Sequence, residues 1–357
     1  MLLSVEFSSL ILQWYRKKRR YFPWRTTKCT YKVWLSEVIL QQTRTSQGLS
    51  YYTKFTDTFP TINDLALAKE EKVLKLWQGL GYYSRARNLH ATAKHVHYNL
   101  KGVFPNNYEN LLKLKGIGPY TAAAISSICF NEKRAAVDGN VYRILARVFD
   151  IHTAINSTAG IKTFQKLADS LISETEPGDY NQGLMDIGAT ICTPKNPNCS
   201  NCPLNSICIA KSKKIIDKLP VKIKKTKIKE RYLNYFCIEH NEQFLMKKRT
   251  DQDIWKNLYD FPLKELNYNT EEISTLNQKT IKSIIGKNSF TIKKSKQYKH
   301  KLSHQKLNIT IHHVTTEQAP HRNEYTKVNQ KQALELPVPK PIEKFFQELF
   351  NSLDCER

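Results

Sequence analysis

The most distinctive chemical feature of this 357-residue sequence is a group of four closely spaced cysteines. They follow the pattern C-x6-C-x2-C-x5-C and are Cys192, Cys199, Cys202 and Cys208. Four thiolates on short loops suit one metal centre, either a tetrahedral zinc ion or an iron–sulfur cluster. The other four cysteines are scattered, which does not suit a disulfide scaffold, so we expect a reducing compartment.

Two carboxylates have sequence surroundings that could adapt them to acid–base chemistry. Glu37 falls in an apolar helical stretch, residues 31–43, beside Trp34. Burial there would raise its pKa and allow it to act as a general acid; a solvent-facing glutamate is the alternative. Asp138 lies in the segment V-D-G-N-V, where it could also cap the helix that follows. A general acid and a stabilising anion are the two carboxyl groups that glycoside hydrolysis uses.

A glycine-rich turn lies ahead of this aspartate. The segment L-K-G-I-G-P-Y contains Gly116 and Gly118, ends at Tyr120 and leads into the apolar run 121–130. Glycines allow backbone N–H groups to approach a ligand closely, and the start of a helix favours an anion. We therefore expect a phosphate-binding turn, with a plain tight turn as the alternative.

The elements that must position these residues change in character along the chain. Residues 1–211 show mainly helical periodicity, beginning with an amphipathic helix in which Phe7 and Ile11 share a face. The lysine-rich stretch 212–229 predicts an extended basic linker. Alternating segments beyond it predict strands, at 232–238, 244–248, 290–293 and 307–312. The last apolar segment, 341–353, predicts a helix. We expect an all-α domain over 1–211 and an α+β domain over 230–357.

The charge balance points to a polyanionic partner. Lys and Arg number 56 against 32 Asp and Glu, a formal net charge of +24, which favours nucleic acid. No apolar run approaches the roughly 20 residues of a membrane span, and the order of charged and apolar residues at the N-terminus is wrong for a signal peptide. We expect a cytoplasmic protein with access to the chromosome.

Together these motifs resemble those of the adenine DNA glycosylases, the MutY family of the helix-hairpin-helix or endonuclease III superfamily. The segment L-S-E-x-x-L-Q-Q-T at 35–43 resembles the family's catalytic helix, and residues 77–89 match a second motif. The hairpin over about 107–130, the V-D-x-x-V segment and the cysteine loop at 192–208 follow in the family's order. The resemblance implies a multidomain protein: an all-α helix-hairpin-helix domain with a [4Fe–4S] loop, and an α+β Nudix-like domain.

The resemblance also implies roles for individual residues. Glu37 would protonate adenine and help activate water, and Asp138 would stabilise the sugar cation, with Tyr120 and Asn140 in support. The expected adenine pocket contains Trp24, Arg25 and Asp186. The expected DNA contacts are Gln42, Thr43, Tyr82, Gly116 and Gly118. The four cysteines would hold one [4Fe–4S] cluster.

Tyr120 bears on the reaction type, because bifunctional glycosylase/lyases of the superfamily carry a Schiff-base lysine there. Its phenol cannot act as an amine nucleophile. We therefore expect a monofunctional N-glycosylase, acting as a monomer in base excision repair on duplex DNA with adenine opposite 8-oxoguanine or guanine. The adenine must leave the base stack to react. The abasic product implies a downstream endonuclease, and no membrane partner is expected.

The C-terminal part resembles the family's Nudix-like domain through F-L-M-K-K-R at 244–249 and I-W-x-x-L-Y-D-F-P at 254–262. Residues 263–290 lack the glutamate-rich R-E-x-x-E-E box, so nucleotide hydrolysis is not expected. Ser303 and His304 match the loop that reads 8-oxoguanine, with Leu302 where the family usually has Phe. The histidines at 300, 304, 312 and 313 are expected on strand surfaces of a DNA-binding face; a metal site is the alternative.

Two other functions compete with this interpretation. One is an endonuclease III-like glycosylase/lyase for oxidised pyrimidines, which Tyr120 and the C-terminal domain disfavour. The other is a catalytically silent DNA-binding protein, which the presence of both Glu37 and Asp138 disfavours.

Overall fold

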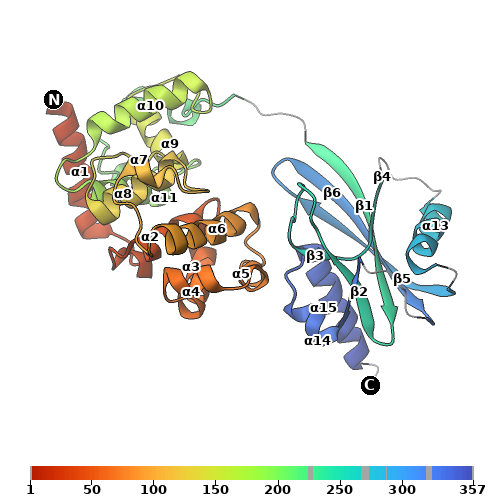
Figure 1. Ribbon diagram of the computed structural model, residues 1–357. Helices are drawn as coiled ribbons and strands as arrows, with labels where there is room; N and C mark the ends of the chain where they lie inside the picture. The colour runs from red at the N-terminus through yellow and green to blue at the C-terminus, as the bar shows by residue number, and fades with distance from the viewer. Residues whose placement is uncertain (1, 224–227, 267–272, 287, 319–323, 356–357) are drawn as a thin grey trace. The chain divides into compact units, whose positions relative to one another are not determined.

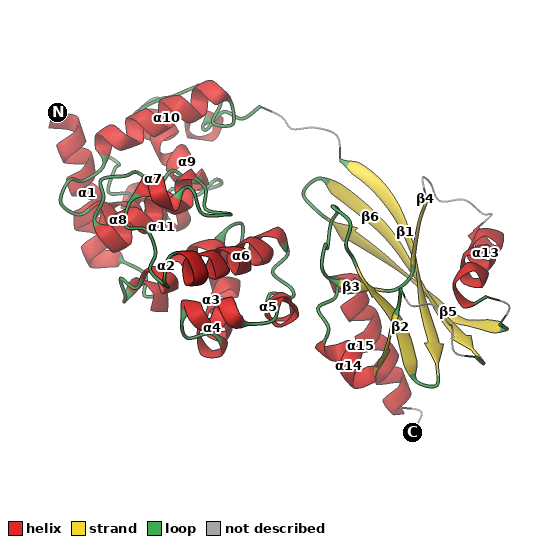
Figure 2. Cartoon of the chain, in the orientation of Figure 1, coloured by secondary structure: helices red, strands yellow, loops and turns green. Residues whose placement is uncertain are grey.

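The computed structural model describes residues 2–223, 228–266, 273–286, 288–318 and 324–355. The chain divides into two compact units. The first contains residues 1–67 and 88–225 and is built from helices; the second contains residues 68–87 and 226–357 and combines a sheet with helices (Figures 1 and 2). We call them the helical unit and the mixed unit.

The helical unit follows the chain order of its helices, with α6 crossing the division between the units. Its elements are α1 (Leu2–Lys18), η1 (Pro23–Arg25), α2 (Thr30–Leu40), α3 (Thr45–Thr58), α4 (Ile62–Leu67), α6 (Ser84–Asn99), α7 (Tyr108–Leu111), α8 (Pro119–Phe130), α9 (Gly139–Val148), α10 (Thr158–Leu171), α11 (Pro177–Thr190), η2 (Cys199–Asn201), α12 (Ile209–Ser212) and η3 (Ile216–Lys218).

The core of this unit confirms the helical periodicity read from the sequence. Phe7 and Ile11 of α1 are fully buried and pack with residues of α9, α10 and α11, including Leu145 and Phe164. Residues four apart share a helix face, so this stripe fixes α1 against the others. The apolar-periodic stretch 62–76 forms two helices, α4 and α5 (Glu70–Leu76), because Lys69 between them is extended.

The prediction of an extended basic linker over 212–229 is wrong for the first half of that stretch. Its first half contains η3, and Leu219 is only 2% exposed within the core of the helical unit. The Ile155 N–H donates to the Val221 carbonyl at 3.0 Å. Ile215, Ile216 and Val221 are partly buried against the same core, and the Ile223 N–H donates to Asn156 Oδ1 at 2.8 Å, so the stretch is attached through residue 223. Residues 224–227 lie outside the described part of the chain.

The mixed unit is an α+β sandwich around one twisted sheet. Its elements are α5, β1 (Lys229–His240), β2 (Gln243–Lys248), β3 (Tyr259–Asp260), β4 (Leu263–Leu266), α13 (Ile273–Ile285), β5 (Phe290–Lys301), β6 (Gln305–Thr316), β7 (Thr326–Asn329), α14 (Gln330–Glu335) and α15 (Lys340–Cys355). The main strand order is β3-β2-β1-β6-β5, with β4 also paired to β1 and β7 to β2. The β1–β6 pair is parallel and its neighbours are antiparallel.

Helices cover opposite faces of this sheet. The adjacent residues Phe244 and Leu245 of β2 point to different faces, as strand geometry requires. Phe244 packs against Phe346 of α15, whereas Leu245 shares a cluster with Ile281 of α13. Both faces therefore have an apolar core, and the predicted strands and C-terminal helix are confirmed.

Two of the four C-terminal histidines do not lie on the surface as expected. His312 and His313 of β6 are 6% and 9% exposed. β6 is an inner strand with covered faces, so its histidines are enclosed and hydrogen-bonded: His312 Nδ1 lies 2.7 Å from Ser295 Oγ, and His313 Nε2 lies 2.6 Å from Glu239 Oε2. In the part of the chain that the structure describes, no group of three His, Cys, Asp or Glu side chains is arranged around a single ion, and no helix is long and apolar enough to cross a membrane.

Candidate functional site

Glu37 lies in α2, a helix enclosed on nearly every side. Val33, Trp34, Leu35 and Val38 are among its buried residues, and a helix apolar all round must be surrounded by protein. The Glu37 side chain keeps some solvent exposure. Burial is the largest influence on its carboxyl and raises its pKa from 4.5 to about 7. Such a carboxyl is populated in both protonation states at neutral pH, as a general acid must be.

The glycine-rich turn is shaped as a helix entrance. Gly116 has φ +79°, and a Cβ there would come within 2.7 Å of Asn88 Cβ, so both backbone and packing require glycine. Gly118 is the N-cap of α8 with open space around its Cα, and Pro119 supplies the first helical residue. The exposed turn thus leads to free N–H groups at the start of α8, an arrangement suited to a phosphate.

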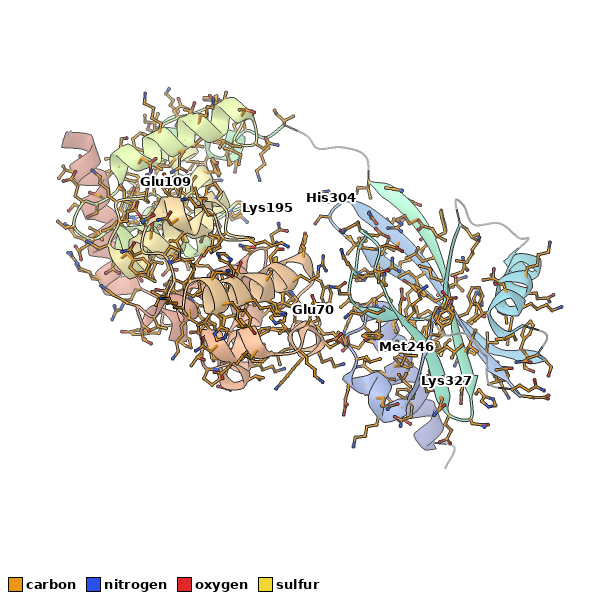
Figure 3. The ribbon with its side chains drawn as sticks, viewed as in Figure 1. Glu70, Glu109, Lys195, Met246, His304 and Lys327 are labelled. Carbon is orange, nitrogen blue, oxygen red and sulfur yellow. The ribbon has the colours of Figure 1, made fainter. Side chains whose placement is uncertain are left out.

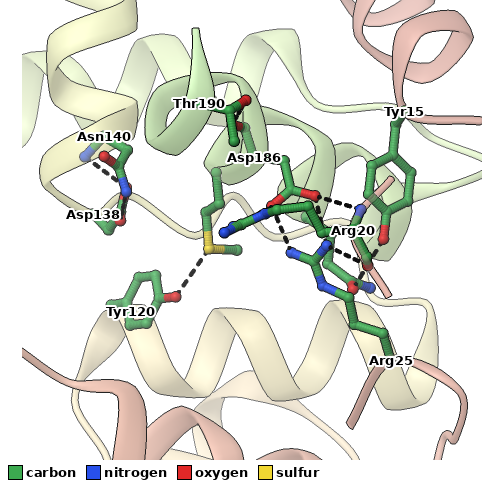
Figure 4. A network of polar contacts seen from close by, with 10 residues as sticks. Tyr15, Arg20, Arg25, Tyr120, Asp138, Asn140, Asp186 and Thr190 are labelled. Carbon is green, nitrogen blue, oxygen red and sulfur yellow. Dashed lines mark hydrogen bonds and ion pairs between the residues drawn. The ribbon is translucent and has the colours of Figure 1, made fainter. Parts of the chain in front are cut away.

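Tyr120 follows directly and joins this turn to Glu37. The Tyr120 side chain hydrogen-bonds Glu37, which lowers the Glu37 pKa and so opposes the effect of burial. Its hydroxyl also lies 3.0 Å from Met185 Sδ (Figure 4). Burial, and then the negative charges of Glu37 and Asp138, raise the pKa of Tyr120 well above its ordinary value. Tyr120 is therefore a neutral hydrogen-bond donor, not a base.

Asp138 is held at the mouth of α9 by three hydrogen bonds. Its Oδ1 accepts from the backbone N–H groups of Asn140 and Val141 at 2.9 Å each, and its Oδ2 accepts from Asn140 Nδ2 at 2.8 Å. Burial is the largest influence and holds the pKa of Asp138 above its ordinary value, although these hydrogen bonds and nearby Arg143 oppose the rise. Asp138 is therefore a helix cap, and this position holds its carboxyl group within electrostatic reach of Glu37.

Asp186 is the centre of a buried ion-pair network (Figure 4). Arg25 donates to Asp186 from Nη1 at 2.5 Å and from Nη2 at 3.0 Å. Arg20 donates from Nε at 2.7 Å. Burial alone would raise the pKa of the fully buried Asp186, but Arg25 and then Arg20 hold it below its ordinary value. Arg25 is also close enough to Glu37 to lower the Glu37 pKa.

Arg20 is not among the site residues expected from the sequence. Its only signal is a place at the end of the basic run R-K-K-R-R, which is typical of a solvated surface. Trp24 was expected and is found nearby: it is 7% exposed and stacks on Phe22 with ring centroids 4.8 Å apart. Beside these residues is a hollow of about 560 Å³, lined in part by Arg20, Arg25 and Gln182.

The four cysteines converge as the sequence predicts. Together they line one cavity, whose other walls include Ile144, Val148, Ile191, Leu204 and Ile216. Arg147 donates from Nη1 to Cys192 Sγ at 3.3 Å, which places a positive side chain beside the cysteine group. An apolar cavity lined by all four thiols, with a positive side chain at its edge, fits a cubane iron–sulfur cluster.

Arg143 connects the carboxylate site with the cysteine loop. Its guanidinium donates to Asn140 Oδ1 at 2.8 Å, to the Gly188 carbonyl at 2.7 Å and to the Cys192 carbonyl at 2.7 Å. The close approach depends on Gly188, since a Cβ there would lie 2.4 Å from Asn140 Cβ. α9, α11 and the start of the cysteine loop are thus fixed together around Asp138.

The expected DNA contacts of the helical unit lie at its surface. Gln42 is exposed and has φ +56° just after α2, while Thr43 is half-buried. Gln41, which sequence analysis did not select, donates to Thr121 Oγ1 at 3.2 Å and so anchors this turn to α8.

The remaining expected residues belong to the mixed unit. Tyr82 is 44% exposed with φ +48°, in a turn after Gly79 and Gly81. Ser303 and His304 are exposed in the loop between β5 and β6; Figure 3 labels His304. The Tyr82 and Ser303 hydroxyls are hydrogen-bonded to each other.

The segment 263–290, which lacks the glutamate-rich box, contains Glu265, Glu271 and Glu272. Glu265 forms an ion pair with Arg231 at 2.6 Å, so its carboxylate has a structural partner. Glu271 and Glu272 lie outside the described residues.

Three family models match consecutive parts of the chain. Residues 35–169 match the HhH-GPD superfamily of base excision DNA repair proteins, residues 192–208 the iron–sulfur binding domain of endonuclease III, and residues 234–348 the NUDIX domain. The fold and site therefore define a base excision DNA repair glycosylase with an iron–sulfur loop and an added NUDIX domain. The iron–sulfur domain implies a [4Fe–4S] cluster on the four cysteines.

Relatives narrow this class. The adenine DNA glycosylase of Buchnera aphidicola subsp. Acyrthosiphon pisum is 36% identical over 356 residues, covering 96% of this chain and 99% of the relative. That of Mus musculus is 44% identical over 57% of this chain and 41% of its own length. The chain belongs to the adenine DNA glycosylase family, whose activity is hydrolysis of N-glycosyl bonds in base excision repair.

Solved structures agree on the helical fold. A thermostable thymine-DNA glycosylase is 31% identical with a TM-score of 0.55, and covers 59% of this chain and 97% of its own. Endonuclease III in a non-covalent DNA complex is 19% identical with a TM-score of 0.51, over 60% of this chain and 99% of its own, and supports the fold alone.

Proposed function

We propose that this protein removes adenine paired with 8-oxoguanine, and with guanine, from duplex DNA by hydrolysing the N-glycosidic bond. One observation carries the proposal: Glu37, with a pKa of about 7, lies within electrostatic reach of Asp138 and is hydrogen-bonded to Tyr120. An acid poised near neutrality beside a capped carboxylate provides the two groups that this reaction needs.

The residues divide the reaction between them. After the adenine leaves the stack, protonated Glu37 donates to the leaving base, which breaks the bond to the sugar. Asp138, whose oxygens accept three hydrogen bonds, stabilises the positive charge that develops on the sugar. The ionised Glu37 then accepts a proton from the attacking water. Asn140 positions Asp138, and Tyr120 positions Glu37.

Trp24, Arg25 and Asp186 form the pocket for the displaced adenine. The double ion pair of Asp186 with Arg25 and Arg20 prevents these side chains from collapsing into the site. Arg25 presents a planar donor and Trp24 a flat apolar surface, which together suit a heteroaromatic base. We include Arg20 in this pocket.

The remaining assignments concern DNA. Gln42, Thr43 and Tyr82 enter or flank the base stack, and the turn with Gly116 and Gly118 binds a backbone phosphate. Ser303 and His304 recognise the oxidised guanine through hydrogen bonds. The [4Fe–4S] cluster on Cys192, Cys199, Cys202 and Cys208 supplies a structural cross-link for the loop that supports α9.

The reaction is monofunctional, since Tyr120 offers no amine at the hairpin. The product is an abasic site, which a separate endonuclease must process. We further propose that the enzyme works as a monomer, in the compartment that holds the chromosome. The excess of 24 positive charges predicts steeply salt-dependent binding.

The test is single-turnover cleavage of labelled duplexes containing adenine opposite 8-oxoguanine, guanine or thymine, or containing thymine glycol. We expect strand breaks at the mispaired adenine only after alkali, lost in Glu37→Gln and kept in the surface control Glu109→Gln. Cleavage at thymine glycol without alkali would identify an endonuclease III-like lyase instead. Tight binding without any cleavage would identify a silent DNA-binding protein.

A further inference from the structure

The segment that carries Tyr82 is held by the lesion-reading part of the mixed unit. This segment, residues 68–87, contains α5 and the turn with Gly79 and Gly81, whose φ angles are +99° and +73°. The Tyr82 hydroxyl is hydrogen-bonded to Ser303 in the β5–β6 loop. The residue proposed to enter the base stack and the residue proposed to read the lesion are therefore in direct contact in the free protein.

Two acidic residues at the start of α5 make the most specific contacts. Glu70 accepts two hydrogen bonds from Asn257 Nδ2, at 3.0 Å and 2.9 Å. Glu71 accepts from Lys248 Nζ at 2.5 Å, and this hydrogen bond lowers its pKa. We call these four residues the α5 clasp (Figure 3 labels Glu70). Their side chains are partly buried, where ion pairs are screened less than on an open surface.

Three further contacts extend the attachment on both sides of Tyr82. Lys75 Nζ donates to the Leu336 carbonyl at 3.1 Å, and the Val338 N–H donates to Gln78 Oε1 at 3.2 Å. After Tyr82, Arg87 Nη1 donates to the Lys256 carbonyl at 2.9 Å. The segment is thus anchored before and after its turn.

The loop that contains Asn257 has a backbone conformation fixed by its own hydrogen bonds. Asn257 has φ +67°, a conformation that asparagine tolerates better than most residues. Its N–H donates to the Arg249 carbonyl at 2.8 Å, and the Arg249 N–H donates to the Leu258 carbonyl at 2.9 Å. Asn257 therefore presents its amide to Glu70 from a fixed backbone.

The negative charges of Glu70 and Glu71 also support a positioning role for these residues. In a protein with an excess of 24 positive charges that binds DNA, two adjacent glutamates near a DNA-contacting turn repel phosphate. Lys248 offsets one of these negative charges, and the Asn257 amide hydrogen-bonds the Glu70 carboxylate. Their placement is explained if their task is to attach the turn to the sheet.

We propose that Glu70, Glu71, Lys248 and Asn257 are positioning residues that keep Tyr82 in register with Ser303, so that entry into the base stack and reading of 8-oxoguanine occur as one event. The clasp then sets the preference for adenine opposite 8-oxoguanine over adenine opposite guanine, and leaves bond cleavage unaffected. This proposal rests on the proposed function.

The test compares Lys248→Met and Asn257→Gly with the wild type. Glycine keeps the positive φ of Asn257 and removes its amide. Lys247→Met is the matched control, since Lys247 is the next residue of β2 and pairs with Glu324 outside the clasp. Affinity is measured for duplexes with a non-cleavable adenine analogue opposite 8-oxoguanine or guanine. We expect about a tenfold loss of preference for 8-oxoguanine in the clasp variants, within the range of coupled charged contacts, and none in the control.

Two additional readouts separate positioning from general damage. Lys248→Arg should restore the preference, and the single-turnover rate on adenine opposite guanine at saturating enzyme should stay within about twofold of wild type. Equal losses of affinity for both duplexes would overturn the proposal and leave the clasp a structural contact.

If the proposed function is wrong, the experiments give a different result. In that case the wild type excises neither mispaired adenine. A fluorescent 2-aminopurine beside the 8-oxoguanine then still reports entry of Tyr82 into the stack. A signal that falls in Lys248→Met and Asn257→Gly but not in Lys247→Met supports the clasp, and identical signals in all variants refute it.

Discussion

Arg25 and Asp186 form a two-point ion pair, with Nη1–Oδ2 and Nη2–Oδ1 distances of 2.5 and 3.0 Å. Asp186 is fully buried, and Arg25 is 13% exposed at its side chain. The pair joins η1 to α11, two elements about 160 residues apart in the sequence. It therefore fixes one wall of the proposed adenine pocket.

Removing the charge of Asp186 should lower the free energy of unfolding. Asp186→Asn leaves Arg25 and Arg20 without their shared anion, and we expect a loss of about 3 kcal/mol in the free energy of unfolding, as for other broken buried pairs. Urea-induced unfolding measures it. The control Glu176→Gln breaks the exposed pair with Arg16 and should cost less than about 1 kcal/mol. Similar costs for both variants would contradict a buried network.

The pKa of Glu37 predicts how the rate depends on pH. A general acid must be protonated, so the single-turnover rate should fall as pH rises above about 7. Glu37→Gln cannot donate this proton and should be slower by about 10²- to 10⁴-fold across the range. The profile is measured at saturating enzyme on adenine opposite 8-oxoguanine. A wild-type rate that keeps rising from pH 7 to 9 would rule out Glu37 as the acid.

The same raised pKa predicts a cost in stability. The folded state holds the Glu37 proton more tightly than the unfolded state, so wild type loses stability relative to Glu37→Gln as pH rises from 4.5 to about 7. Allowing for partial exposure, we expect Glu37→Gln to gain about 2 kcal/mol over wild type between pH 4.5 and 8. Urea unfolding at both pH values checks this. A stability difference that does not depend on pH would show that burial does not raise the pKa of Glu37.

Gly188 should be essential to the position of Asp138. Gly188→Ala places a Cβ 2.4 Å from Asn140 Cβ and must displace the residue that holds the Asp138 carboxylate. We expect a fall in the single-turnover rate of about 10²-fold, because small misplacements of catalytic groups are costly. Gly139→Ala is the control, since its Cβ meets nothing within 4 Å. If both variants keep the wild-type rate, contact with α11 does not position the site.

The cysteine loop predicts the effect of losing its cluster. The purified protein should be brown with broad visible absorption, and Cys199→Ser should weaken that absorption. Because Arg143 and Arg147 bind the loop to α9, cluster loss should lower both thermal stability and DNA affinity. Calorimetry and a binding titration measure these. A colourless wild-type protein containing zinc would contradict the assignment.

Some features were predictable from local patterns. The stripe of Phe7 and Ile11 marked α1, alternation marked β1 and β6, and the cysteine spacing marked a single centre, because each depends on a short period or a short loop. Glu37 and Asp138 were found through motifs a few residues long. The prediction of an extended linker over 212–229 is wrong in its first half for the same reason. Lysine content is a local property of the sequence, whereas the burial of Leu219 depends on α9 and α10.

The amino-acid sequence specifies the chemical groups and the local elements that carry them: a carboxyl in an apolar helix, a second carboxyl at a helix cap, a glycine turn and four thiols. How these groups act on one another depends on the folded arrangement. Burial in α2 raised the pKa of Glu37, Arg20 joined Arg25 on Asp186 from within a basic run, and Arg143 tied Asn140 to the cysteine loop. The reason is physical: pKa shifts and ion pairs depend on distance and burial, and both are set by residues remote in the chain.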